Sequence, residues 1–163
     1  WSACRTVEKN IIDYDYLLNL EKHGYIEFIP YKERDKININ ELNISFKQNP
    51  HPITTYSTKI QIPNISIVYS SDTGYNNNQL EKFAQNANLL ICESTFLRGQ
   101  TRLEDYHLFA HEAGMIASSA NVDKLLLTHF WPTIDKEQYV REAKEYFENT
   151  EAAIEGQKLI LRR

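Results

Sequence analysis

Cysteine is scarce in this chain of 163 residues, which contains only Cys4 and Cys92 and no Cys-x-x-Cys pair. Two distant thiols exclude a disulfide framework and a thiolate zinc site, and they favour a reducing, cytoplasmic environment. Long apolar runs are lacking too, so the sequence predicts neither a membrane span nor a secretion signal. The only methionine, Met115, lies far inside the chain, so we expect the sequence to be a piece of a longer protein.

A surplus of basic residues is also absent. The 18 Lys and Arg are outnumbered by 22 Asp and Glu, which gives a net charge of -4 and a pI of about 5.7. Such a chain has no general positive field for nucleic acid, so any contact with a polyanion must be local. With 42% apolar, 12% aromatic and 25% charged residues, it has the composition of a globular protein, and its length predicts one domain over 1–163.

The pattern of apolar residues predicts a mixed α/β architecture. Helical spacing predicts four helices, at 6–22, 78–87, 107–120 and 136–148. Runs with β character between Pro and Asn turns predict strands at 25–29, 42–46, 57–61, 65–69, 89–92, 124–127 and 158–161. This order indicates one sheet, partly mixed in direction, with helices covering one face.

Potential ligands or acid–base groups follow four of the expected strands. His51, Asp72 and His129 each come shortly after a strand, and Glu93 directly follows another. Loops beyond strand ends present side chains to a shared crevice in layered α/β folds, so we expect these residues to converge. Two imidazoles and a carboxylate are a ligand set that zinc accepts. Each residue alone could be a turn residue or a satisfied polar group, so only the joint pattern indicates a metal site.

Two further histidines stand at the start of the helix expected over 107–120. His107 and His111 are four residues apart and could share one helical face, a spacing by which two imidazoles can hold a metal. Alternatively, the positive end of the helix dipole favours a neutral His107 suited to proton transfer. We expect His111 to be exposed to solvent.

Taken in order, these motifs resemble the C-terminal part of a metallo-β-lactamase-fold hydrolase, in the branch of ribonuclease Z-like proteins and small phosphodiesterases. The segments 51–60, 67–73 and 125–130 are similar to the third, fourth and fifth motifs of that branch, although the Gly and Arg that usually follow the third motif's histidine are absent. The segment 92–96 is similar to the branch's His-Glu-Ala-Thr-Phe. The family's HxHxDH cluster does not occur in this sequence.

The resemblance implies an αβ/βα metallo-β-lactamase fold, of which the chain forms the C-terminal portion, a mixed sheet covered by helices. It implies that His51, Asp72 and His129 bind two divalent metal ions, zinc in the first place, with manganese or iron as other ions that these ligands accept. It also implies that Glu93 and His107 form a proton-transfer pair. The metals would polarise a phosphoryl oxygen and activate water for phosphodiester cleavage. We expect the HxHxDH cluster upstream, and weak metal binding by this piece alone.

The expected substrate is a small, nucleotide-like phosphodiester. Residues 52–71 leave no room for the long arm with which ribonuclease Z proteins clamp transfer RNA, and the acidic charge balance also disfavours that RNA. No membrane partner is expected, and apolar surface on a half-sheet would favour a homodimer. Two alternatives stay open: a non-catalytic binding or scaffold protein of the same fold, and a dimeric aspartic protease that uses the triplet 72–74, which leaves the histidines unexplained.

Overall fold

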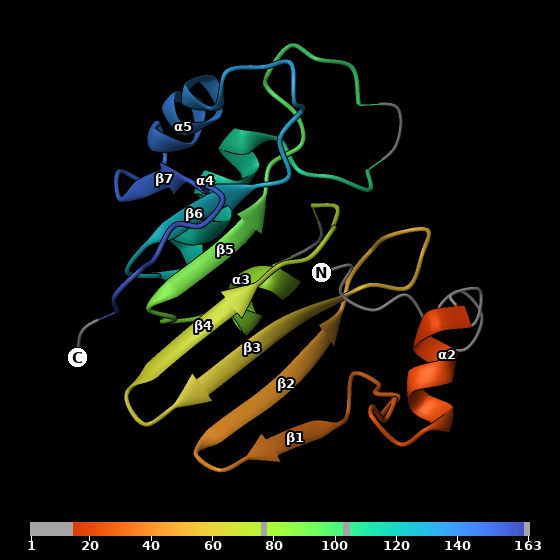
Figure 1. Ribbon diagram of the computed structural model, residues 1–163. Helices are drawn as coiled ribbons and strands as arrows, with labels where there is room; N and C mark the ends of the chain where they lie inside the picture. Colours follow the sequence, from red (N-terminus) through yellow and green to blue (C-terminus); the bar gives the residue numbers. More distant parts are fainter. Residues whose placement is uncertain (1–14, 76–77, 103–104, 162–163) are drawn as a thin grey trace.

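The computed structural model describes residues 15–75, 78–102 and 105–161. These residues form a mixed α/β fold around one sheet of seven strands, in the order β1 to β7, so each strand pairs with its neighbours in sequence (Figure 1). The elements are, in order, α2 (Asp15–Lys22), β1 (Lys36–Ile39), β2 (Leu42–Gln48), β3 (Tyr56–Ile62), β4 (Ile65–Tyr69), α3 (Gln79–Phe83), β5 (Leu89–Glu93), α4 (Ala110–Ala120), β6 (Leu125–Thr128), α5 (Lys136–Lys144) and β7 (Thr150–Ala152).

The sheet changes character at β4. From β1 to β4 the strands are antiparallel, and from β4 to β7 they are parallel. A two-residue turn joins β3 to β4, and its Pro63 and left-handed Asn64 (φ 67°) suit the two central positions of a type II turn. The parallel strands need longer crossovers, which contain α3, α4 and α5.

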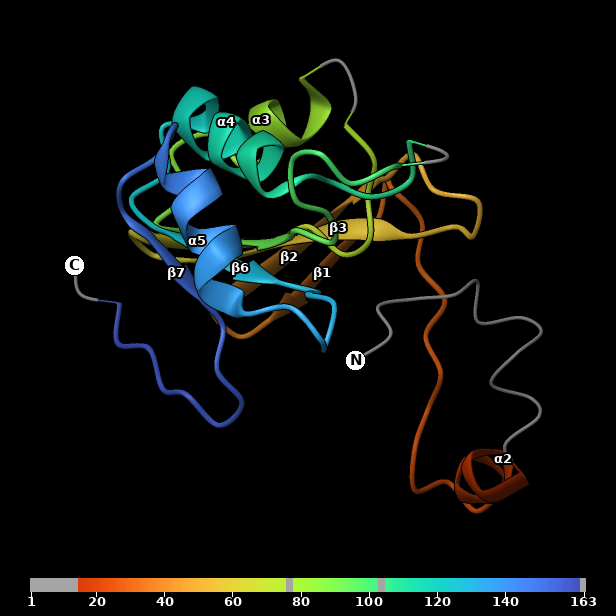
Figure 2. The same ribbon diagram turned by 90° about the horizontal axis from the view of Figure 1, so that it is seen from above.

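The core lies between the parallel strands and these three helices, which cover one face of the sheet (Figure 2). Val68, Leu90 and Leu125 point from the sheet into this core and are fully buried. The helices approach each other closely at Gly114, where an added Cβ would lie 2.4 Å from the carbonyl oxygen of Ala143. A side chain at position 114 would therefore push α4 away from α5.

The opposite face of the sheet is also rich in apolar residues. The register places Ile60 between Ile44 and Ile67, on the face away from Val68 because side chains alternate along a strand. Ile60 is 36% exposed, and Figure 2 shows α2 set apart from the sheet.

Among the described residues, no helix combines the length and apolar character needed to cross a membrane.

Most of the expected elements are present, and the differences concern two strands that do not form, two strands that were not expected and the ends of three helices. The segments 25–29 and 158–161 are not strands, because neither finds a partner strand among the described residues, and β1 and β7 were not predicted. The helix expected over 78–87 spans only Gln79–Phe83. The helix expected over 107–120 begins only at Ala110, and the helix expected over 136–148 ends at Lys144. Of the helix expected over 6–22, the part before Asp15 lies outside the described residues.

Candidate functional site

The five residues that the resemblance assigns to the site, His51, Asp72, Glu93, His107 and His129, lie in loops at one edge of the sheet or, for Glu93, at the end of β5 (Figure 1). The loops meet at this edge because β2, β4, β5 and β6 run in the same direction, so their carboxyl ends lie on the same side of the sheet. The ring centroids of His51 and His107 are 5.3 Å apart, and those of His107 and His129 are 5.2 Å apart. Nδ1 of His129 lies 3.6 Å from Oδ1 of Asp72 and 3.9 Å from Oε2 of Glu93. The fold therefore brings all five side chains together.

Glu93, the last residue of β5, is the buried centre of the site, with its side chain 1% exposed. Oε1 accepts hydrogen bonds from the Thr73 N–H at 2.7 Å and from Nδ1 of His107 at 2.8 Å. Oε2 accepts from the Thr95 hydroxyl at 2.9 Å and the Leu108 N–H at 3.1 Å. Burial alone would raise the pKa of Glu93, but the surrounding donors, His107 foremost, lower it to about 2. Glu93 is therefore held as a carboxylate.

His107 is oriented by Glu93 and by the loop that carries it. Because Nδ1 donates to the carboxylate, Nε2 is the ring nitrogen left to take or give a proton. Nη1 of Arg102 donates to the His107 carbonyl oxygen at 3.0 Å and to Glu112 at 2.7 Å, and Nη2 lies 2.8 Å from Asp105. These contacts fasten the loop to the start of α4, so both the ring and the backbone of His107 are fixed.

His129 follows β6 in a left-handed backbone conformation, with φ 62°. Its Nδ1 lies 3.0 Å from the Thr95 hydroxyl, which in turn donates to Glu93. The interaction with the Glu93 carboxylate raises the pKa of His129, burial partly opposes the shift, and the charge of Asp72 adds to it. The Asp72 side chain is 40% exposed, so its carboxylate can be approached from solvent.

His51 lies in the loop between β2 and β3, where Nδ1 is 3.1 Å from the carbonyl oxygen and 3.3 Å from the amide nitrogen of Ile53. In the part of the chain that the structure describes, Nδ1 is thus the nitrogen that binds protein atoms in His51, His107 and His129. Nε2 of each ring is therefore the nitrogen available to a metal ion or a substrate.

The donor set fits a divalent cation. One ligand atom from each of Glu93, His107 and His129 lies within 4.8 Å of the others, close enough to share an ion. However, both oxygens of Glu93 already accept two hydrogen bonds each, and a metal would leave those buried donors unsatisfied. The more exposed Asp72, next to His129, is the better carboxylate ligand. Imidazole nitrogen with carboxylate oxygen is a set that zinc accepts.

A hollow of about 370 Å³ opens beside His129. It is lined by Phe130, Trp131, Lys136 and Ile154, among others, and the Trp131 side chain is 48% exposed. No local sequence pattern indicates this hollow, because its lining comes from residues 128–136 and 153–155, which are distant in the sequence. It offers space for an apolar or aromatic group next to His129.

The prediction that His111 is exposed is wrong. Its Nδ1 lies 2.8 Å from Oε1 of Glu142, a residue of α5, and its side chain is 21% exposed. It pairs with this acid rather than with His107, so the two histidines do not form a shared ligand pair.

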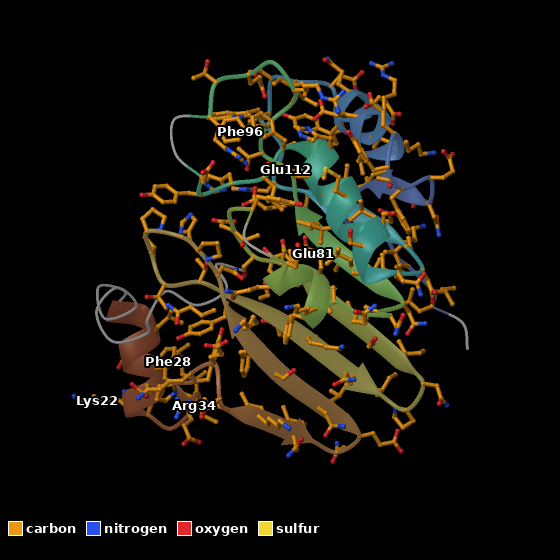
Figure 3. All side chains as sticks on the ribbon, turned by 180° about the vertical axis from the view of Figure 1, so that it is seen from behind. Lys22, Phe28, Arg34, Glu81, Phe96 and Glu112 are labelled. Carbon is orange, nitrogen blue, oxygen red and sulfur yellow. The ribbon has the colours of Figure 1, made fainter. Side chains whose placement is uncertain are left out.

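Figure 3 shows Glu112 on α4 and Phe96 near the loop of His107, whose ring is 6.4 Å from that of Phe96. In the same view Phe28 lies beside α2, away from the site.

Comparisons with known proteins agree with this architecture. A family model described as the beta-lactamase superfamily domain matches residues 10–130. The metallo-beta-lactamase fold protein YhfI of Bacillus subtilis is 30% identical over 117 residues, which are 72% of this chain and 48% of YhfI. The crystal structure of YhfI superposes with a TM-score of 0.73 at 27% identity, covering 83% of this chain and 58% of that structure.

Two further proteins are similar. Ribonuclease Z of Clostridium acetobutylicum is 35% identical over 109 residues, which are 59% of this chain and 35% of the ribonuclease. A diphosphatase of the PhnP family shares the fold, with a TM-score of 0.68 at 14% identity, covering 93% of this chain and 55% of that structure. The chain spans about half the length of the curated relatives it matches, or less.

Proposed function

The chain belongs to the family of beta-lactamase superfamily domains. From this premise we propose that it forms part of a metal-dependent hydrolase that cleaves a phosphodiester bond. One observation carries the proposal: the buried Glu93 and its partner His107 lie directly beside the pair of Asp72 and His129. An oriented acid–base group and a set of metal ligands in contact are what metal-assisted hydrolysis needs.

In this proposal His51, Asp72 and His129 contribute ligands to two divalent metal ions. Nitrogen and carboxylate ligands suit zinc first, and they also accept manganese or iron. When bound, such ions polarise a phosphoryl oxygen and lower the pKa of water. The role of the chain itself is to hold the ligands: the contacts of Nδ1 with Ile53 and Thr95 fix the rings of His51 and His129.

In this proposal His107 is the general acid that protonates the leaving group. Glu93 accepts a hydrogen bond from the Nδ1–H group of His107. Nε2 can therefore donate a proton to the leaving oxygen and then take up another proton from solvent. The low pKa of Glu93 keeps the carboxylate charged throughout this exchange, so it remains a hydrogen-bond acceptor for Nδ1 of His107. Arg102 holds the backbone of His107 in place while the ring changes its charge.

A small phosphodiester is the substrate that the observations support. Ribonuclease Z and the PhnP-family diphosphatase, to which this chain is similar, are named for phosphorus–oxygen bond chemistry. The hollow beside His129 can accept an apolar or aromatic substituent of the substrate. The net charge of -4 and the short segment between His51 and Asp72 do not favour transfer RNA.

The proposal also includes pairing of two chains through the apolar sheet face that carries Ile60.

The test compares the full-length wild-type protein with its Asp72→Ala variant in metal content and in hydrolysis of a chromogenic model phosphodiester. Asp72→Ala should lose both metal and activity, because it removes a metal ligand. The activity of the wild-type protein should disappear with a chelator and return with zinc or manganese. A full-length wild-type protein that binds no divalent metal, or whose hydrolysis is indifferent to the chelator, would contradict the proposal and favour the non-catalytic alternative.

A further inference from the structure

Asn49, the residue that follows β2, uses its whole side chain to bridge two segments of the site. It is 8% exposed. Its Nδ2 donates to the Ser70 carbonyl oxygen at 2.7 Å and to the Asp72 carbonyl oxygen at 3.1 Å. Its Oδ1 accepts from the Ser57 hydroxyl at 2.7 Å. Because only this orientation of the amide places donors against carbonyls and an acceptor against the hydroxyl, the side chain is locked.

The two carbonyls bound by Asn49 flank a strained residue. Ser71 lies between them with φ 53°, a left-handed conformation that is costly for a residue with a Cβ. A donor that bridges the carbonyl groups on both sides opposes relaxation of this turn. The turn is the one that directs Asp72 towards His129, so its conformation sets where the carboxylate lies.

The same bridge also sets the spacing between two of the proposed ligands. Asn49 and His51 belong to one loop, and the Gly74 N–H donates to the Pro50 carbonyl oxygen at 3.1 Å. The Thr55 hydroxyl, from the far side of that loop, donates to the Asp72 carbonyl oxygen at 2.8 Å. The loop of His51 and the turn of Asp72 are thus joined as one unit, with the Asn49 amide at its centre.

We propose that Asn49 is a positioning residue, which holds the turn of residues 70–72 and thereby fixes the Asp72 carboxylate relative to His51 and His129. This inference rests on the proposed function, since it assigns the bridge to a metal site. It requires no contact between Asn49 and the metal. Supporting groups of this kind, behind the ligands, change metal affinity about 10- to 100-fold when they are removed.

The variant Asn49→Ala tests the bridge without leaving bare carbonyls. The Ser70 carbonyl oxygen still lies 2.9 Å from the Ser57 hydroxyl, and the Asp72 carbonyl oxygen keeps Thr55. The matched control is Asn88→Ala. Asn88 accepts from the Ser66 N–H at 2.8 Å and donates to Asp123 at 2.7 Å, near the far end of β4, so it is a comparable cross-link away from the site.

The first measurement is hydrogen–deuterium exchange of the metal-free protein. In Asn49→Ala, a peptide that covers 69–75 should exchange faster than in wild type, whereas Asn88→Ala should leave that peptide unchanged. Equal exchange of the peptide in wild type and Asn49→Ala would overturn the proposal. This readout does not depend on metal, so it separates a failure of the bridge from a failure of the proposed function.

The second measurement is zinc affinity by competition with a chromogenic chelator, together with melting temperature. Asn49→Ala should bind zinc about 10- to 100-fold more weakly than Asn88→Ala. A merely structural role would lower the melting temperature of both variants and leave both zinc affinities equal, and that result would overturn the proposal. If the full-length wild-type protein itself binds no zinc, the proposed function is refuted and the positioning role with it, while the exchange data still show whether the bridge holds the turn.

Discussion

Replacing Glu93 by Gln keeps the size of a side chain that is 1% exposed but converts one oxygen into an amide nitrogen. The carboxylate accepts four hydrogen bonds, two on each oxygen. In the less costly orientation the nitrogen replaces Oε2, the Thr95 hydroxyl rotates to accept from it, and the Leu108 N–H loses its acceptor. One buried, unsatisfied donor costs about 1–3 kcal/mol, and neutral hydrogen bonds on the other oxygen are weaker than charged ones. We therefore expect Glu93→Gln to lower the free energy of unfolding by about 2–4 kcal/mol.

Urea denaturation of the metal-free protein, followed by circular dichroism, measures this loss. Glu151→Gln is the control, because that side chain is 49% exposed and its partner Lys124 lies 2.6 Å away. Surface pairs of this kind contribute about 0–1 kcal/mol, so the control should remain close to wild type. In a double-mutant cycle, Glu93→Gln should cost less when His107 is already Ala, because one of the four donors is then absent.

The reasoning fails if Glu93→Gln is no less stable than Glu151→Gln. That outcome would mean that the four donors find other acceptors, and that Glu93 is not the fixed centre of the site. A cycle in which the two substitutions are strictly additive would show in addition that Glu93 and His107 do not interact in solution.

Three other substitutions give independent tests. His107→Ala should keep its metal while turnover of a model phosphodiester falls roughly 10²- to 10⁴-fold, and loss of metal equal to that in Asp72→Ala would show that His107 is a ligand instead. Burial raises the pKa of Glu81 above 4.5, so the stability linked to its proton is present at low pH and is lost as the pH rises through the pKa of the folded state. Glu81→Gln should therefore be more stable than wild type at neutral pH but not at about pH 4, as measured by urea denaturation at both values. Gly114→Ala should lose about 1–3 kcal/mol and melt at a lower temperature, because the new Cβ would lie 2.4 Å from the Ala143 carbonyl oxygen, and an unchanged melting temperature would show that α4 and α5 can separate freely.

The strands that carry the site were predictable because their sequences are largely apolar. The segments 65–69, 89–92 and 124–127 are short, nearly continuous apolar runs, which is typical of parallel strands covered by helices. A polar residue after such a run stands out, and this is how Asp72 and His129 could be singled out. Their convergence followed from the rule that parallel strands end at the same edge.

Other features depend on contacts that a local pattern does not contain. The segment 25–29 has the alternation of a strand but finds no partner strand within the part of the chain that the structure describes. In contrast, β7 is only three residues long and forms because β6 lies beside it. His111 was expected to be exposed because its partner, Glu142, lies 31 residues further along the chain. The roles of Arg102 and Asn49 rest in the same way on contacts between loops, so neither could be found before the fold was known.

The sequential strand order affects how the chain can assemble during synthesis. In the described ranges each strand pairs with the one made just before it, so the sheet can grow by adding strands at one side, and none of these seven strands has to enter between two that are already paired. The antiparallel half closes through short local turns and can form early, while each parallel strand must wait for its crossover helix. If synthesis paused after β4, strands β1 to β4 could already be paired as an antiparallel sheet, and β4 would be the edge strand with which β5 pairs next.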